Sequence, residues 1–129
     1  AVQAEFSCGF CTDAQGAQTI GRTFRESRYL LDTHTAVACT VLDAYRAETS
    51  DQTLTVVEST ASPFKFCASV LDALGVTEHA PGTGVLGQLT AETGRPAPKP
   101  LASLAGKPVR FDQVTDRGDM RAVVTEFLR

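Results

Sequence analysis

The sequence predicts an α/β fold that is rich in helices and contains one or two strands. The strand evidence is the run at 54–57 (LTVV), whose β-branched residues and length are typical of a buried strand. Ser62 and Pro63 follow it as the N-cap and first residue of a helix, because the hydroxyl can accept a free backbone N–H and proline lacks a donor that this position does not need. Apolar residues spaced three and four apart before and after the strand predict further helices.

Two helices are expected before the strand. The segment 12–15 (TDAQ) matches a capping box, and Ala17, Ile20 and Phe24 follow it at helical spacing. A second start signal, Asp32-Thr33, precedes a helix over 36–45, whose apolar residues are Val37, Val41, Ala44 and Tyr45.

Helical spacing returns after the strand. An apolar stripe ends at Gly75, a residue type that favours a helix C-terminus, and consists of Cys67, Val70, Leu71 and Leu74. A shorter helix is expected over 83–93, followed by an extended, proline-rich strap at 94–100. The segment 107–111 alternates like an edge strand, and a final amphipathic helix carries Met120, Val123, Val124, Phe127 and Leu128.

The chain is expected to form a single unit over 1–129 that is part of a larger domain. Its 129 residues can bury one core. One or two strands are too few for the sheet that a Val/Thr-rich strand between helices needs, since sheets usually hold about 5 or 6 strands. Neighbouring strands are therefore expected to come from outside this sequence.

Composition excludes several partners. The net charge is -3 and no basic run occurs, so nucleic acid is not an expected partner. No apolar stretch approaches the about 20 residues that span a bilayer, and the segment 1–5 lacks a basic stretch followed by an apolar one, so no membrane association and a cytoplasmic location are expected. The four cysteines are expected to be free thiols.

The candidate site is the hydroxyl-rich segment 59–65, which joins the strand to the next helix. Ligands of open α/β sheets bind outside the carboxyl ends of strands, and helix amino ends favour anions. One alternative is a plain turn with a solvated Lys65. Another is a serine acylase, since 62–65 fits S-x-x-K, but S-D-N is only approximated, upstream, and no K-T-G occurs.

Metal or redox chemistry is not expected elsewhere. Cys8 and Cys11 have C-x-x-C spacing, but no second pair completes a zinc site and no βαβ context supports a redox motif. His34 and His79 lack metal-ligand spacing. His34 falls in the first turn of a predicted helix, where a structural hydrogen bond and a part in a polar site are both open.

Two motifs together resemble the C-terminal portion of bacterial threonine synthase. They are 29–38 (YLLDTHTAVA) and 59–66 (STASPFKF), and their order and separation match that family. The segments 99–101 and 106–109 and the closing helix are also similar to the family's carboxyl end. The resemblance therefore covers almost all of the chain.

The resemblance implies part of a pyridoxal-phosphate enzyme of the tryptophan-synthase-like fold (fold type II), which converts O-phospho-L-homoserine and water to L-threonine and phosphate. It places the Schiff-base lysine and the glycine-rich phosphate cradle upstream of Ala1. No catalytic residue is thus expected in this chain, and the fragment alone is expected to be inactive, to bind no cofactor and to need the missing N-terminal portion as its partner.

The resemblance also implies roles for site residues. Thr60 matches the hydroxyl that hydrogen-bonds the pyridine nitrogen of the cofactor, and a neutral hydroxyl there need not protonate the ring. Ser59, Lys65 and His34 are candidates for substrate-phosphate contacts or for support of the site, and Thr35 also matches a family motif. Lys65 does not match the Schiff-base lysine.

The alternative function is a non-catalytic binding or regulatory module that keeps the same fold. A reading frame that continues upstream of Ala1 would favour the interpretation as a fragment of threonine synthase. A gene that begins near Ala1 would favour the binding or regulatory module. If the fragment interpretation holds, apolar surface is expected to be exposed or covered by self-association.

Overall fold

The structure is a computed structural model that describes residues 5–129. Residues 1–4 lie outside the described range. They belong to the segment 1–5, in which the sequence analysis found no basic stretch followed by an apolar one. The elements are, in order, α1 (Asp13–Ser27), α2 (Thr33–Thr49), η2 (Pro63–Lys65), α3 (Cys67–Ala73), α4 (Gly84–Thr93), α5 (Lys99–Ala102), η3 (Ser103–Gly106), η4 (Arg117–Asp119) and α6 (Met120–Phe127). None of the described helices is long and apolar enough to cross a membrane.

The first two helices begin where their start signals predict. Thr12 caps α1 in a capping box, in which its Oγ1 accepts from the Gln15 amide and Gln15 Oε1 accepts from the Thr12 amide at 2.8 Å. Asp32 caps α2 with its carboxylate. Local hydrogen bonds at the two N-caps therefore set where α1 and α2 begin.

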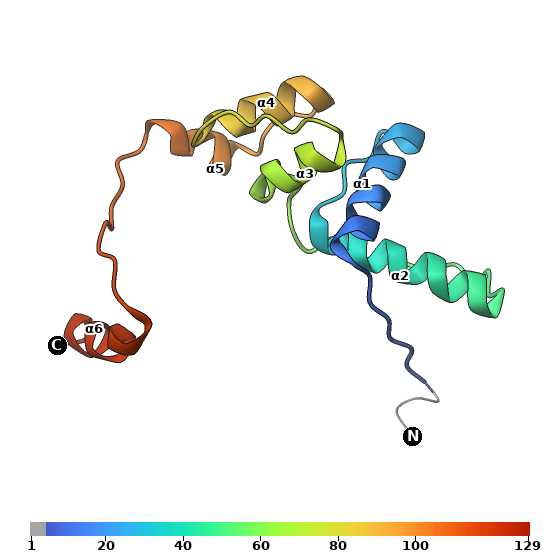
Figure 1. The fold of residues 1–129 in the computed structure, drawn as a ribbon, viewed down its shortest axis with the longest axis horizontal. Coiled ribbons are helices and arrows are strands. Elements are labelled where there is room, and N and C mark those ends of the chain that lie inside the picture. Colours follow the sequence, from blue (N-terminus) through green and yellow to red (C-terminus); the bar gives the residue numbers. More distant parts are fainter. Residues whose placement is uncertain (1–4) are drawn as a thin grey trace.

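The core lies where α1 packs against α2 and α3, and where α3 packs against α4 (Figure 1). Its buried apolar residues are Ile20, Phe24, Leu30, Leu31, Ala36, Phe64, Cys67, Val70, Leu71 and Leu89. Gly21 allows the close approach of α1 to α3, because a Cβ at this position would lie 2.6 Å from the carbonyl oxygen of Ala73. The absence of a side chain at Gly21 thus allows α1 and α3 to pack this closely.

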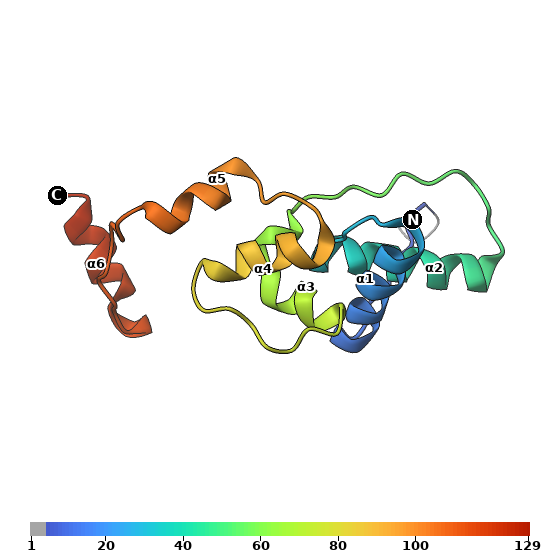
Figure 2. The same cartoon turned by 90° about the horizontal axis from the view of Figure 1, so that it is seen from above.

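The predicted α/β fold class is wrong, since no strand forms among residues 5–129. The segment 54–57 is irregular, and Leu54 and Val56 are 92% and 85% exposed. A strand needs neighbouring strands for its N–H and C=O groups, and the described residues contain none. The segment instead doubles back beside α2 (Figure 2), where Arg46 Nη2 donates to the Thr53 carbonyl oxygen at 3.2 Å.

Two further predictions after residue 90 need correction. The expected edge strand at 107–111 is irregular, for the same reason, and Val109 and Phe111 are exposed. The predicted strap at 94–100 ends at residue 98, because Lys99 and Pro100 begin α5, whose first turn tolerates proline.

The carboxyl-terminal part lies apart from the core in both views (Figures 1 and 2). The segment 107–116 leads to η4 and α6. The amphipathic helix predicted near the end of the chain is confirmed as α6, but no residue of this helix is buried. Its apolar face is therefore left open.

Candidate functional site

A groove of about 650 Å³ lies between α2 and the segment that doubles back beside it. His34 and Thr35 from the first turn of α2 line it, together with Thr60 from the hydroxyl-rich segment. Its remaining wall is mostly apolar and comes from Ser7, Gly9, Val37, Ala38, Val41, Leu42, Tyr45, Thr55, Val56, Val57 and Glu58. The fold thus brings together residues from the two motifs that carry the family resemblance.

The carboxylate of Asp32 joins α2 to the hydroxyl-rich segment. Asp32 is 1% exposed, and its Oδ1 accepts from the amides of His34 at 2.9 Å and Thr35 at 3.3 Å. Its Oδ2 accepts from the Thr35 hydroxyl and, at 3.5 Å, from the Ser59 hydroxyl.

Thr35 Oγ1 and Ser59 Oγ are themselves 3.1 Å apart. These contacts connect residues that are 27 positions apart in the sequence. Asp32 and Thr35 therefore hold Ser59, the residue before Thr60, against the start of α2.

The hydrogen bonds also keep Asp32 ionised. Burial alone would raise the pKa of this carboxyl group, but the Thr35 hydroxyl and the amides of His34 and Thr35 outweigh it and lower the pKa below the ordinary value of 3.8. A buried charge is normally costly, and here these hydrogen bonds and the helix amino end compensate it. The network therefore has a negative charge at neutral pH.

His34 lines the groove from the first turn of α2. Its side chain is 63% exposed, and its Nδ1 lies 3.4 Å from Asp32 Oδ1. The ring packs against Phe66, with 4.9 Å between ring centroids and 58° between planes. One side of the imidazole therefore contacts Phe66, and the rest of the side chain remains exposed.

The remaining candidate residues are placed differently. Ser59 acts within the Asp32 network and does not line the groove. Lys65 is exposed in η2 and is also outside the groove lining. Ser62 caps a helical turn at the predicted position, since its Oγ accepts from the Phe64 amide at 3.3 Å, but this turn is the short 3-10 helix η2 and α3 begins separately at Cys67.

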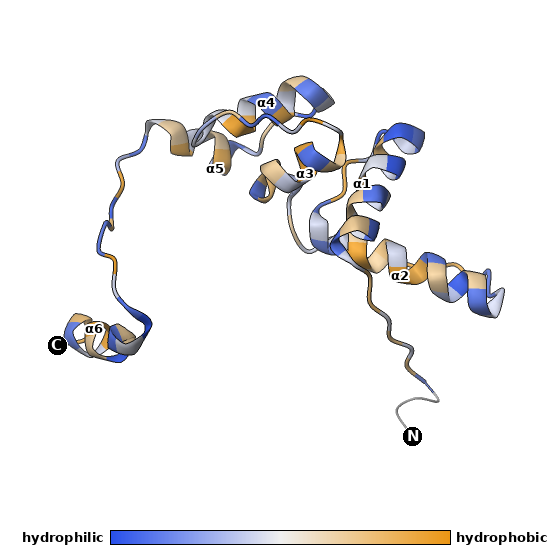
Figure 3. Ribbon diagram, viewed as in Figure 1, coloured by the Kyte–Doolittle hydropathy of each residue, from blue (hydrophilic) through white to orange (hydrophobic). Residues whose placement is uncertain are grey.

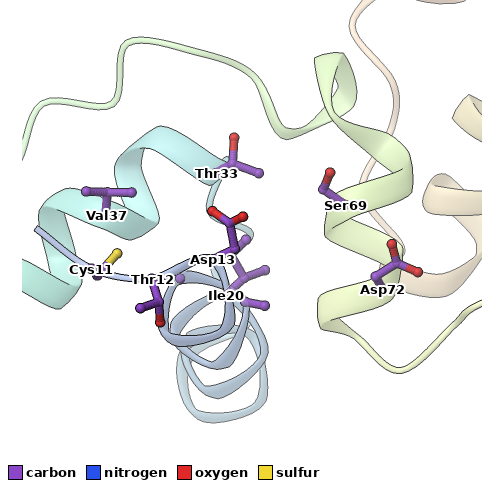
Figure 4. A pocket seen from close by; sticks show the side chains of 10 residues that line it. Cys11, Thr12, Asp13, Ile20, Thr33, Val37, Ser69 and Asp72 are labelled. Atoms are coloured by element: carbon purple, nitrogen blue, oxygen red, sulfur yellow. The ribbon is translucent and has the colours of Figure 1, made fainter.

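A second cleft, of about 450 Å³, lies between the amino ends of α1 and α2 and the side of α3. Figure 4 shows Asp13 and Thr33 on one side and Ser69 and Asp72 on the other. Asp72 Oδ1 lies 3.1 Å from His79 Nε2. None of the predicted site residues lines this cleft, which leaves the α2 groove as the candidate functional site.

The cysteines and histidines form no metal centre within residues 5–129. Cys8 is exposed and Cys11 is half-buried, and neither belongs to a disulfide. Burial raises the pKa of the Cys39 and Cys67 thiols. These two side chains therefore remain protonated thiols in the helices that hold them.

Sequence reasoning missed the role of Asp32, which it treated only as a helix start. The available signal was the hydroxyl of Thr35, three residues after the cap, because this position faces the N-cap side chain. The partnership with Ser59 has no local signal in the sequence.

The groove combines hydroxyls and an imidazole with a mostly apolar wall, which is the chemistry typical of a small-molecule site. A family model described as "Threonine synthase, C-terminal" matches residues 35–125. The chain belongs to this family.

Curated relatives match a shorter region. The protein called Threonine synthase-like 1 is 34% identical over 77 residues in the mouse and in Macaca fascicularis, and 32% identical in humans. Each match covers 60% of this chain and 10% of the relative. The chain thus spans about a tenth of the length of the relatives it matches.

Proposed function

We propose that this chain is the C-terminal part of a pyridoxal-phosphate-dependent threonine synthase, a carbon–oxygen lyase that converts O-phospho-L-homoserine and water to L-threonine and phosphate in the cytoplasm. The observation that carries the proposal is the family match over residues 35–125, which includes Thr60 and all of α2 except Thr33 and His34. The length of the relatives supports a parent protein much longer than this chain.

The groove has the chemistry that a pyridine ring needs on one side. The Thr60 side chain is exposed, lines the groove and has no hydrogen-bond partner among the described residues, whereas Ser59 is already engaged by Asp32. A free hydroxyl can bond a ring nitrogen without protonating it, and Val37 and Val57 offer apolar wall. Pyridoxal phosphate, when bound, supplies an electron sink for carbanion chemistry.

The chain alone is proposed to be inactive and to bind no cofactor stably. Its three lysines are Lys65, Lys99 and Lys107, and none of them lines the groove. The lysine that holds the cofactor is therefore proposed to come from the N-terminal portion of the parent polypeptide, which is the partner of this chain.

Three residues are proposed to assist the site. Ser59 positions Thr60 through its contacts with Asp32 and Thr35. His34 lines the groove with a side chain that is 63% exposed, so its imidazole is available to a substrate phosphate, whereas the first amides of α2 are already bonded to Asp32. Lys65 adds positive charge on the same segment as Thr60, outside the groove itself.

The test compares Thr60→Ala with Thr55→Ala in the polypeptide encoded by the full reading frame. Both residues are threonines of the groove, but Thr55 Oγ1 already lies 3.4 Å from Arg46 Nη2. Loss of one hydrogen bond to the cofactor is expected to lower kcat about tenfold in Thr60→Ala and to shift the absorbance of the bound cofactor. Thr55→Ala should keep the parental kcat and spectrum.

Equal kcat and spectra for the two variants would refute the role of Thr60. A full-length polypeptide that produces neither threonine nor phosphate would refute the enzyme proposal. It would favour the non-catalytic binding or regulatory module instead.

A further inference from the structure

We propose that Arg46 is a positioning residue, which sets the width of the α2 groove by holding the opposite wall against this helix. That wall belongs to residues 53–59, here called the return segment, of which residues 55–58 line the groove (Figure 2). The wall that α2 gives to the groove is largely apolar, as the colours along this helix show (Figure 3). The inference rests on the proposed function in one respect, because it takes the cofactor to be the occupant of the groove.

One end of the return segment is held at the start of α2. Ser59 Oγ lies 3.1 Å from Thr35 Oγ1 and 3.5 Å from Asp32 Oδ2. These contacts fix the position of Ser59, directly before Thr60, and none of them involves Arg46. A change at Arg46 therefore leaves this end in place.

Arg46 holds the other end of the return segment. Its Nη2 donates to the carbonyl oxygen of Thr53 at 3.2 Å and to the hydroxyl of Thr55 at 3.4 Å. Its Nε is buried and bonds no acceptor among the described residues, so this side of the guanidinium is packed within the protein. The Thr53 carbonyl belongs to the peptide group that leads to Leu54. Its bond to Arg46 therefore sets the direction in which the return segment leaves the turn after α2.

The turn itself has separate hydrogen bonds. Asp51 Oδ1 accepts from the amide of Thr53 at 2.8 Å and from its hydroxyl at 2.6 Å, and Asp51 Oδ2 accepts from the Tyr45 hydroxyl at 3.2 Å. These bonds hold the amide side of Thr53. Among the described residues, the only hydrogen bond from α2 to the carbonyl oxygen of Thr53 comes from Arg46. The course of the groove wall beyond Thr53 therefore depends on Arg46.

The return segment has little slack between its two anchors. From Thr35 to Arg46, α2 rises about 16 Å at about 1.5 Å per residue. From Thr53 to Ser59, an extended chain spans about 20 Å at about 3.3 Å per residue. No backbone group of residues 54–58 bonds another backbone group among the described residues. The segment can therefore bow away from α2 only slightly while both ends are held, and release of Thr53 removes this limit.

The width of the groove determines how well its apolar walls contact a flat ring. Val57, which is half-buried, lines the groove from the return segment, and Val37 lines it from α2. A gap of about 0.5 to 1 Å on one side of a packed group already removes about a quarter to a half of its dispersion attraction. Because Ser59 still holds the residue before Thr60, the loss of Arg46 should weaken cofactor binding more than it slows the reaction of the bound state.

Titration of pyridoxal phosphate into the apo form of the polypeptide encoded by the full reading frame tests this inference. Arg46→Gln removes the guanidinium, whereas Arg46→Lys keeps a donor and the positive charge in the last turn of α2. The control is Arg22→Gln, which removes an ion pair with Asp43 outside the groove.

We expect Arg46→Gln to raise the dissociation constant of the cofactor about 3- to 10-fold, as partial loss of an apolar contact does. At saturating cofactor, kcat should fall less than it does in Thr60→Ala. Arg46→Lys should lie closer to the parent, and Arg22→Gln should match it. An unchanged dissociation constant in Arg46→Gln, or an equal rise in Arg22→Gln, overturns the inference.

A double-variant cycle shows whether Arg46 acts through the return segment. Val57→Ala should itself weaken cofactor binding, because it removes part of the apolar wall. If Arg46 acts by holding Val57 close, Arg46→Gln should add little in the Val57→Ala background, so the two effects should not multiply. Effects that do multiply would mean that Arg46 acts by another route, which contradicts the inference.

Nuclear magnetic resonance on the purified chain separates this inference from the enzyme proposal. The backbone order parameters of Val56 and Val57 are expected to be about 0.85 in the wild type and in Arg22→Gln, and below about 0.6 in Arg46→Gln. Circular dichroism checks that each variant keeps its helices. A return segment that is already mobile in the wild type, or that stays rigid in Arg46→Gln, overturns the role of Arg46. A full-length polypeptide that binds no cofactor overturns the enzyme proposal instead, and the order parameters still decide whether Arg46 holds the groove wall.

Discussion

Replacement of Asp32 should destabilise the fold more than replacement of any exposed carboxylate. Asp32 is 1% exposed and accepts hydrogen bonds from the amides of His34 and Thr35 and from two hydroxyls. In Asp32→Ala, loss of the N-cap costs about 1 kcal/mol, and loss of hydrogen bonds to a buried charged acceptor costs about 1.5 to 3 kcal/mol. We expect a total loss of about 2 to 4 kcal/mol in the free energy of unfolding.

Asp32→Asn separates the shape of the side chain from its charge. Asparagine caps a helix as well as aspartate does, but its bond from the Thr35 hydroxyl is no longer charge-assisted. We expect this variant to lose about 1 kcal/mol. The control is Asp51→Ala, because Asp51 also accepts from the amide and hydroxyl of a threonine two residues later, and from the Tyr45 hydroxyl at 3.2 Å, but forms no hydrogen bond with the hydroxyl-rich segment 59–65.

Urea unfolding followed by circular dichroism measures these differences, and thermal unfolding provides a second reading. A loss of 1 kcal/mol lowers Tm by about 4 to 8 °C in a domain of 60 to 100 residues. If Asp32→Ala were as stable as the wild type, or no less stable than Asp51→Ala, the buried network would not hold the hydroxyl-rich segment as we describe.

The same carboxylate gives stability a pH dependence of known sign. The pKa of Asp32 is lower in the folded state than its ordinary value of 3.8. Its contribution to stability is therefore fully present well above pH 3.8 and is lost as the pH falls through the folded pKa. The difference in stability between the wild type and Asp32→Asn should shrink as the pH is lowered from 5 toward 2, and a constant difference would contradict the lowered pKa.

Three further outcomes are expected, each measured as a change in the free energy of unfolding. Gly21→Ala should cost about 1 to 3 kcal/mol, because its Cβ would meet the Ala73 carbonyl oxygen at 2.6 Å. Gly87→Ala has open space around the new Cβ and should gain about 0.5 to 1 kcal/mol. Equal effects of the two substitutions would contradict the tight α1–α3 contact. Thr12→Ala should cost about 1 kcal/mol by removing the α1 cap, and no change would mean that the capping box contributes nothing. Val56→Thr should leave stability within about 0.5 kcal/mol of the wild type, because this side chain is 85% exposed, and a large loss would mean that it is buried as a strand residue after all.

The helix starts could be predicted because their determinants are local. The hydroxyl of Thr12, the carboxylate of Asp32 and the hydroxyl of Ser62 each bond backbone amides two or three residues away. A pattern of a few residues is therefore enough to place a cap.

The strands were predicted wrongly because strand formation depends on neighbours. The run 54–57 has the composition of a buried strand, yet composition says nothing about whether another strand lies within reach. In this chain the run lies beside α2, with Leu54 and Val56 exposed. The same reasoning applies to Val109 in the expected edge strand.

The candidate site could be predicted only in part. The motifs singled out Thr60 and His34, which line one groove, while their roles toward a ligand stay predictions. The groove itself depends on the return of residues 55–60 along α2, and the link from Asp32 to Ser59 crosses 27 residues. Contacts of this kind depend on the tertiary fold and leave no spacing pattern in the sequence.

The most direct test of the proposal that this chain is one part of a catalytic site is a phosphate-release assay with O-phospho-L-homoserine and added pyridoxal phosphate. The assay compares the chain alone with the polypeptide encoded by the full reading frame. We expect the full-length polypeptide to release phosphate and form threonine at equal rates, and the chain alone to release none above the background. Turnover by the chain alone, or none by the full-length polypeptide, would contradict it.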